Sequence, residues 1–513
     1  MDSVTGWTGR TACALQAALR LSNEAFAELL GVGVRTVASW HQKPTLRPKS
    51  EMQQLLDTAF EQAPEPVRTR FAALSGTTDD SAPSDAEERL KADPNIGAAL
   101  EWLDEHAGWQ PGDARREVAR RLGQVDVRHL EDRASRRSRV NQREIADALS
   151  SYYRERPDGY GCYATAHAAT SILTQPEWLD LDCSLIGTTE RLALATSSNE
   201  TPSLDDEAAG RAAQRLAESL ARGTRLVNMP LYRLLSADIQ GGQIGGSLGV
   251  APFVHYALTM DLLEAEMTDA LAAGRDPGPG STPLRDRYLP DVASVLDLSG
   301  RLCAGGTLAL CAFARPADPF RGPADYVLLV QERSGHVINA TRKLAVIPKG
   351  FHQPMTDYRA DARLGATLRR EMEEELFGRE DIDNTLADQR TADPMHPSRL
   401  TDAMRWLFDA PGRLRMECTG FGLNLVSGNF EFAGLIVVND EDFWASFGGL
   451  IEANWESSTL RQYSTLDRSL LTEVMSDVAW SNEGLFALSQ GLRRLGQIGG
   501  HRVDLPVIEW EMR

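Results

Sequence analysis

A short polar run from Gly76 to Asp85 divides the chain into two stretches that differ in length and texture. The run consists of small, acidic and turn-forming residues, a composition typical of a linker between folded parts. Apolar residues recur at helical spacing before it, whereas the stretch after it is long enough for more than one hydrophobic core. We therefore expect at least two parts that fold around separate cores.

The 513 residues predict a multidomain protein with an all-α N-terminal domain, a helical middle region and an α+β C-terminal domain. The C-terminal domain is indicated by apolar, strand-like runs at Thr307–Phe313, Tyr326–Val330 and Phe432–Val438. The expected segments are 1–75 for the helical domain, 76–87 for the linker, 88–155 for a helical region suited to dimerisation, 156–290 for a mixed α/β region without an assigned role, and 291–513 for the C-terminal domain.

Composition excludes several classes of protein. No apolar run approaches the roughly 20 residues that cross a bilayer, and the N-terminus lacks the features of a secretory signal. The six cysteines form no C-x-x-C pair, so we expect reduced thiols in a cytoplasmic protein, without a disulfide framework, zinc site or membrane partner. The net charge of −19 confines any contact with nucleic acid to a local surface.

The segment from Ser22 to Gln42 has the pattern of two short helices joined by a tight turn. Ser22 can cap the first helix, and Gly31 stands where the chain needs a left-handed turn. Val37 and Trp40 fall on the inner face of the second helix, where they would pack against the first one. The outer face of that helix then remains available for a major groove.

This segment resembles the phage-repressor (XRE) family of helix-turn-helix transcriptional regulators. Counting from Asn23, Ala, Gly, an aliphatic residue and Trp occupy the fifth, ninth, fifteenth and eighteenth places. The family usually has a polar cap where Gly33 stands. The resemblance, together with the basic residues that follow the motif, implies contact with double-stranded DNA by Val34, Arg35, Thr36, Ser39, Gln42, Lys43, Arg47 and Lys49.

A second motif places three carboxylates on one side of a predicted helix. Glu371, Glu374 and Glu375 are spaced i, i+3 and i+4, and like charges so placed repel unless a cation collects them. Hard divalent ions such as Mg²⁺ take oxygen ligands of this kind, usually together with substrate phosphates. The alternative interpretation is an acidic helix exposed to solvent.

The run Arg-Glu-Met-Glu-Glu-Glu from Arg370 to Glu375 resembles the core of the Nudix box. The segment from Lys343 to Gly350 resembles the approach to that box, and Trp480–Phe486 resembles a late loop and helix of the family. Gly350 lies twenty residues before Arg370, where the full Nudix pattern has fourteen. A Nudix-like fold with Mg²⁺ at Glu371, Glu374 and Glu375 is therefore expected more than Nudix hydrolysis.

Three weaker sequence patterns are interpreted as features of the fold rather than as functional sites. The arginines between Arg133 and Arg139 predict a helix face that is solvated or paired with acids. The glycine-rich run Gly241–Gly249 lacks the lysine of a phosphate loop and predicts a connector. His167 and His255 lie among small or apolar residues and predict core imidazoles.

Together these features predict a homodimeric, DNA-binding transcriptional regulator whose Nudix-like domain senses a small ligand, such as a nucleoside-diphosphate derivative. One alternative is a Mg²⁺-dependent Nudix hydrolase with an attached DNA-binding domain, in which Glu371, Glu374 and Glu375 are catalytic. The other is a non-catalytic scaffold that binds only proteins.

Overall fold

The computed structural model describes residues 7–43, 46–64, 67–68, 70–71, 85–93, 95–187, 189–195, 203–224, 226–333, 343–379, 395–451 and 457–513. The chain divides into two compact units, Met1–Ser84 and Asp85–Arg513. Most of the predicted linker at 76–87 lies outside the described residues, and its last three residues belong to a helix of the second unit. Among the described residues, no helix is long and apolar enough to cross a bilayer.

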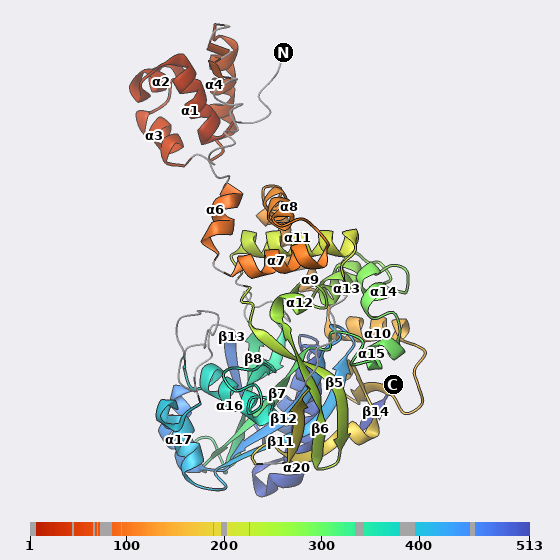
Figure 1. Ribbon diagram of the computed structural model, residues 1–513. Helices are drawn as coiled ribbons and strands as arrows, with labels where there is room; N and C mark the ends of the chain where they lie inside the picture. Colours follow the sequence, from red (N-terminus) through yellow and green to blue (C-terminus); the bar gives the residue numbers. More distant parts are fainter. Residues whose placement is uncertain are drawn as a thin grey trace. The chain divides into compact units, whose positions relative to one another are not determined.

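The first unit is helical, as predicted, and is built from α1 (Gly9–Leu19), α2 (Asn23–Leu30), α3 (Val34–Gln42) and α4 (Ser50–Glu61) (Figure 1). Its small core forms because each helix carries one apolar face, and Trp7, Phe26, Val37, Trp40 and Leu56 are all at most 2% exposed there.

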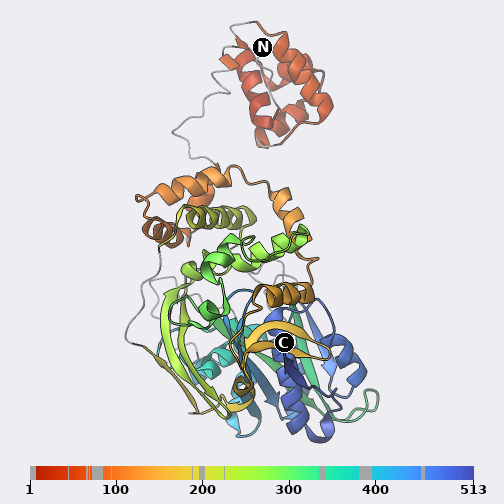
Figure 2. The same cartoon turned by 90° about the vertical axis from the view of Figure 1, so that its right-hand side faces the viewer.

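The second unit begins with helices that pack together on one side of its sheets (Figures 1 and 2). They are α6 (Asp85–Ala92), α7 (Ile96–His106), α8 (Asp113–Leu122), α9 (Val127–Arg137), α10 (Gln142–Tyr152) and the later α11 (Asp206–Arg222). The predicted acid pairing of the arginine-rich helix is confirmed, because Arg133 pairs with Glu218 and Arg137 with Asp269.

A curled, half-barrel sheet dominates the rest of this unit. Its main path runs β13-β8-β7-β12-β11-β2-β1-β14, and the neighbours β7 and β12 are parallel. The strands are β1 (Gly161–Thr165), β2 (Ala169–Thr174), β3 (Leu179–Ser184), β7 (Gly305–Arg315), β8 (Asp325–Arg333), β9 (Leu344–Val346), β10 (Lys349–Phe351), β11 (Leu414–Asn424), β12 (Phe430–Val438), β13 (Ser457–Ser464) and β14 (Trp510–Met512). The predicted strands at Thr307, Tyr326 and Phe432 are thus confirmed.

The sheet separates two hydrophobic cores. On β7, Cys311 and Phe313 enter one core, whereas Leu310 and Ala312 enter the other, as the two-residue repeat of a strand requires. Helix α16 (Leu364–Glu375) packs into the first core and α20 (Asn482–Ile498) into the second. These two helices therefore cover opposite faces of the sheet.

A smaller sheet, β4 (Glu190–Leu194), β6 (Gln243–Pro252) and β5 (Pro230–Gln240), packs into the same core as α16. The connector prediction for Gly241–Gly249 is wrong, because most of this run is strand β6. Its glycines serve a close approach: a Cβ atom on Gly246 would lie 2.2 Å from the carbonyl oxygen of Ser236. The remaining helices are α12 (Phe253–Ala257), α13 (Leu262–Ala272), α14 (Pro283–Tyr288), α15 (Val292–Leu296), α17 (Asp402–Asp409), α18 (Glu441–Phe447) and α19 (Arg468–Met475).

The coarse fold class is confirmed: a helical N-terminal region is followed by mixed sheets with helices, in an α+β chain of multidomain appearance. The sheet takes strands from both sides of residue 290, because β2 and β3 pair with β11 and β1 pairs with β2. The segments 156–290 and 291–513 therefore share one sheet.

Gly365 of α16 and Gly97 of α7 are each the second residue of their helix, so the same substitution at both positions shows how closely α16 packs. A Cβ atom on Gly365 would lie 2.1 Å from the carbonyl oxygen of Leu185, whereas one on Gly97 of α7 meets nothing within 4 Å. We expect Gly365→Ala to destabilise the second unit by about 1–3 kcal/mol. The control Gly97→Ala should leave stability equal or raise it by up to about 1 kcal/mol. Urea denaturation followed by circular dichroism measures both, and equal effects would contradict the packing.

Candidate functional site

Helix α3 of the first unit turns one face to the core and the other to solvent. Ser22 caps α2 by accepting the Ala25 N–H at 3.2 Å, and Gly31 ends α2 in the left-handed conformation with φ of 66°. The ring of Trp40 packs edge-on against Phe26, with centroids 6.5 Å apart. These local predictions are confirmed, and Gly33 indeed supplies no side-chain cap to α3.

The predicted DNA-contacting residues lie on α3 and in the segment that follows it, and they differ in exposure. Arg35, Lys43, Arg47 and Lys49 are exposed, and Val34 is 42% exposed. Thr36 and Ser39 are half-buried, and the Ser39 hydroxyl donates to the Thr36 carbonyl at 2.7 Å. Gln42 is the last residue of α3, but its side chain lies outside the described atoms.

The glutamates of α16 are buried in the second unit, with exposures of 8% for Glu371, 7% for Glu374 and 1% for Glu375. The alternative of a solvated acidic helix is therefore wrong. Glu375 accepts the backbone N–H of Lys349 at 2.7 Å, and Glu371 pairs with Arg370 at 2.8 Å. Glu371 also lies against Gly350, where an added Cβ atom would be 2.1 Å from its Oε1.

Within the described residues, no group of three or more His, Cys, Asp or Glu side chains is arranged to hold a metal ion. The three glutamates share one helix, yet two of them are already engaged by different neighbours, the backbone of Lys349 and the guanidinium of Arg370. Magnesium binding by Glu371, Glu374 and Glu375 therefore stays a prediction.

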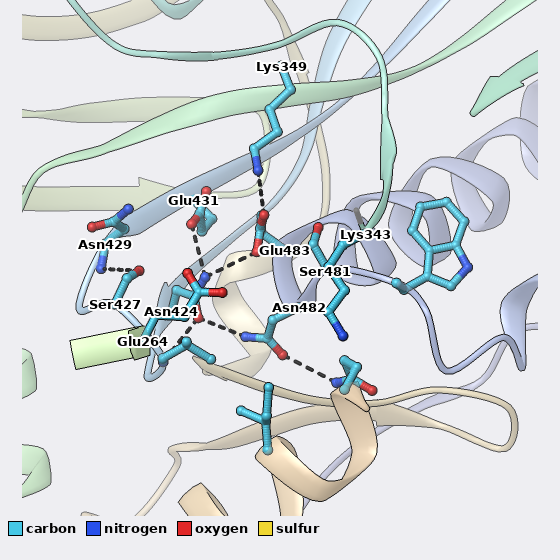
Figure 3. A pocket seen from close by; sticks show the side chains of 14 residues that line it. Glu264, Lys343, Lys349, Asn424, Ser427, Asn429, Glu431, Ser481, Asn482 and Glu483 are labelled. Carbon is cyan, nitrogen blue, oxygen red and sulfur yellow. Dashed lines mark hydrogen bonds and ion pairs between the residues drawn. The ribbon is translucent and has the colours of Figure 1, made fainter. Parts of the chain in front are cut away.

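A polar cavity of about 50 Å³ lies near the N-terminus of α20 (Figure 3). Residues from distant parts of the chain line it: Gln142, Ile145, Glu264, Lys343, Lys349, Asn424, Val426, Ser427, Asn429, Glu431, Trp480, Ser481, Asn482 and Glu483. Three glutamates reach it from three elements, because Glu264 belongs to α13, Glu431 to β12 and Glu483 to α20. We call this cavity the α20 pocket.

Asn424 organises the hydrogen bonds of the α20 pocket. Its amide nitrogen donates to Glu431 at 3.1 Å and to Glu483 at 3.3 Å, and its oxygen accepts from the Asn482 amide at 2.8 Å (Figure 3). Lys349 donates to Glu483 at 2.5 Å. The Lys343 ammonium donates to the carbonyl oxygen of Val140 at 2.8 Å.

The carboxyl groups of the pocket have strongly different pKa values. Burial, reinforced by the charge of Glu483, raises the pKa of Glu431 to about 8 and that of Glu264 to about 7. Burial also opposes ionisation of Glu483, but attraction to Lys349 and the hydrogen bond from it outweigh that effect and lower its pKa. At neutral pH, Glu483 is therefore ionised and Glu431 mostly holds its proton.

No sequence pattern predicts this pocket, although two of its segments, Lys343–Gly350 and Trp480–Phe486, carry part of the resemblance to the Nudix family. A further signal was present in β12, where Glu431 is the one charged residue of an otherwise apolar strand. His255 is buried, as predicted, with burial lowering its pKa to about 3, whereas His167 is half-buried.

Comparison with known proteins does not extend these findings, because no family model matches the chain and no similar sequence is found among curated proteins.

The raised pKa of Glu431 predicts a pH-dependent stability. A carboxyl whose pKa is higher in the folded protein stabilises the fold fully below its ordinary pKa, and this contribution is lost as the pH rises through about 8. We therefore expect Glu431→Gln, which cannot ionise, to melt a few degrees above the wild type near pH 9 and equally near pH 5. The exposed Glu101→Gln serves as a control, and parallel melting curves for Glu431→Gln and wild type would contradict the assignment.

Proposed function

We propose that this protein is a DNA-binding transcriptional regulator that responds to a small ligand. The observation that carries the proposal is the two-sided character of α3. Its inner residues, Val37 and Trp40, are buried against α2, whereas Val34 and Arg35 at its start are exposed. A helix held by its back, with an arginine and an aliphatic residue facing outward, suits a major groove: Arg reads guanine edges, and an aliphatic side chain contacts the thymine methyl group.

Electrostatics restrict this contact to a small surface. The chain carries a net charge of −19, so most of its surface repels phosphate. Exposed Lys43, Arg47 and Lys49 follow α3 directly and supply positive charge for the DNA backbone. We propose a homodimer on a two-fold site, with half-sites about 34 Å apart, because one short helix per chain gives little affinity alone.

The ligand-sensing role belongs to the second unit, which we propose to be Nudix-like. The arrangement that supports this is a mixed sheet with α16 on one face and α20 on the other, and with Gly350 packed against a carboxylate of α16. The resemblance places a nucleoside-diphosphate derivative with Mg²⁺ beside α16. The α20 pocket offers a second place for a small effector.

Substitution of Arg35 tests the DNA-binding role. We expect Arg35→Ala to weaken binding to the DNA upstream of the protein's own coding region at least tenfold, because a bidentate base contact contributes about 1–3 kcal/mol. Fluorescence anisotropy at two salt concentrations measures it. Arg68, an exposed arginine of the same unit beyond α4, gives the matched control Arg68→Ala, with an expected change below twofold.

The same titration separates specific from electrostatic binding. Lys49→Ala should weaken binding to all sequences alike and reduce the salt slope by about one phosphate contact. If wild type and Arg35→Ala bound the upstream DNA and an unrelated duplex equally, α3 would not read sequence.

The second candidate is a Nudix hydrolase, favoured by the burial of Glu371, Glu374 and Glu375 on one helix beside Gly350. Such an enzyme would use these carboxylates to hold Mg²⁺, which activates water for attack on phosphorus. We expect no turnover of ADP-ribose, NADH or diadenosine polyphosphates with Mg²⁺, as followed by chromatography. Turnover that Glu374→Gln abolishes would replace the sensor by the enzyme, whereas equal turnover in both proteins would indicate a contaminant.

A further inference from the structure

We propose that the α20 pocket binds a small organic cation, a primary ammonium or guanidinium group on a short aliphatic chain. The observation behind this proposal is that, of the three carboxyl groups gathered in the pocket, those of Glu264 and Glu431 have acceptor sites to which no described residue donates. That the cation acts as the effector rests on the proposed regulatory function, whereas its binding does not.

Two carboxyl groups have acceptor sites that the described residues leave unfilled. Glu431 is only 5% exposed, and the Asn424 amide donates to one of its oxygens, with no donor to the other among the described residues. The Glu264 carboxyl points toward Asn424 (Figure 3), and the described part of the chain supplies it with neither a hydrogen bond nor an ion pair. Buried acceptors are normally satisfied, so the buried Glu431 and the half-buried Glu264 beside it can take a donor from a ligand or from water.

Both lysines of the pocket already donate to a neighbouring group. Lys349 pairs with Glu483, and Lys343 donates to the Val140 carbonyl. Around Glu264 stand Glu483 and Asp261, which oppose its ionisation, and Lys343 and Lys349, which favour it. Around Glu431 stand Glu483 and Lys349. Three acids face two lysines, and at neutral pH the excess acid is held neutral by a proton, which an incoming cation would replace.

Size and charge exclude other ligand classes. A phosphate would bring negative charge next to the ionised Glu483, and about 50 Å³ holds roughly four water molecules, far less than a nucleotide needs. The described carboxylates are not arranged for a metal ion. Ile145, Val426 and Trp480 add an apolar wall, which suits the methylene groups of an alkylamine.

Binding of a cation should release protons. When an ammonium group enters, Glu264 and Glu431 ionise and donate their protons to the solvent, because the new charge favours their carboxylate forms. The ligand affinity should therefore rise several-fold between about pH 6 and pH 8.

Calorimetry on the full-length protein tests the proposal with defined probes: butylamine and methylguanidine, against butanol as the neutral isostere and inorganic phosphate as the anion. We expect the two cations to bind and to release protons, as measured in buffers of different ionisation enthalpy. Glu264→Gln should weaken binding about tenfold or more, since a hydrogen bond between charged groups contributes about 1.5–3 kcal/mol. Glu101→Gln, an exposed change on α7, should leave it intact.

Each other outcome overturns the proposal. Butanol binding as well as butylamine would show that the pocket takes neutral donors, phosphate binding that Glu264→Gln abolishes would show an anion site, and no binding by either cation would refute the ligand class. If Glu264→Gln fails to fold, Glu431→Gln carries the same test, with proton release from the wild type as an independent readout.

The effector role has a separate readout. Saturating cation should change the affinity of the wild type for the upstream DNA and should not change that of Glu264→Gln. Cation binding without this change would refute the effector role and keep the pocket assignment. Cation binding by a protein that ignores the upstream DNA would instead refute the regulator.

Discussion

The buried ion pair between Lys349 and Glu483 connects the two layers of the second unit. The Lys349 side chain reaches α20 on one face of the sheet, while its backbone N–H donates to Glu375 of α16, the helix on the opposite face. A buried charge that loses its partner costs several kcal/mol, so both partners are held in place. Strand β10 is only three residues long, yet through Lys349 it contacts both helices.

The same ion pair determines the protonation of the α20 pocket. Burial raises the pKa values of Glu431 and Glu264, and the negative charge of Glu483, which Lys349 keeps ionised, raises them further. Carboxyl groups that interact so closely titrate as a set rather than singly. The pocket is therefore sensitive to any added charge, and a ligand that brings one changes the protonation of more than one residue.

Local sequence patterns predicted the structure correctly wherever the residues in contact lie close together in the sequence. Ser22, Gly31 and Trp40 lie within one helix-turn-helix, and each has the conformation or burial that its pattern predicted. The apolar runs that became β7, β8 and β12 were equally clear. The run Gly241–Gly249 was misassigned because glycine usually marks turns, whereas here Gly246 permits the close approach of Ser236 on the paired strand.

The α20 pocket could not be predicted from local sequence patterns. Glu264, Glu431 and Glu483 come from three elements that no short-range pattern connects, and only the sheet with its covering helices brings them together.

The second unit thus buries carboxylates in two distinct ways. On α16, Glu375 and Glu371 are matched by a backbone N–H and a guanidinium, so these groups already have partners that a metal ion would have to replace. In the α20 pocket, Glu431 holds its proton because burial, reinforced by the charge of Glu483, raises its pKa. A carboxyl group that burial keeps neutral changes its protonation most when a cation binds beside it, because the cation supplies the positive charge that stabilises the carboxylate. This contrast favours the α20 pocket over α16 as the site of the ligand binding that we propose for the second unit.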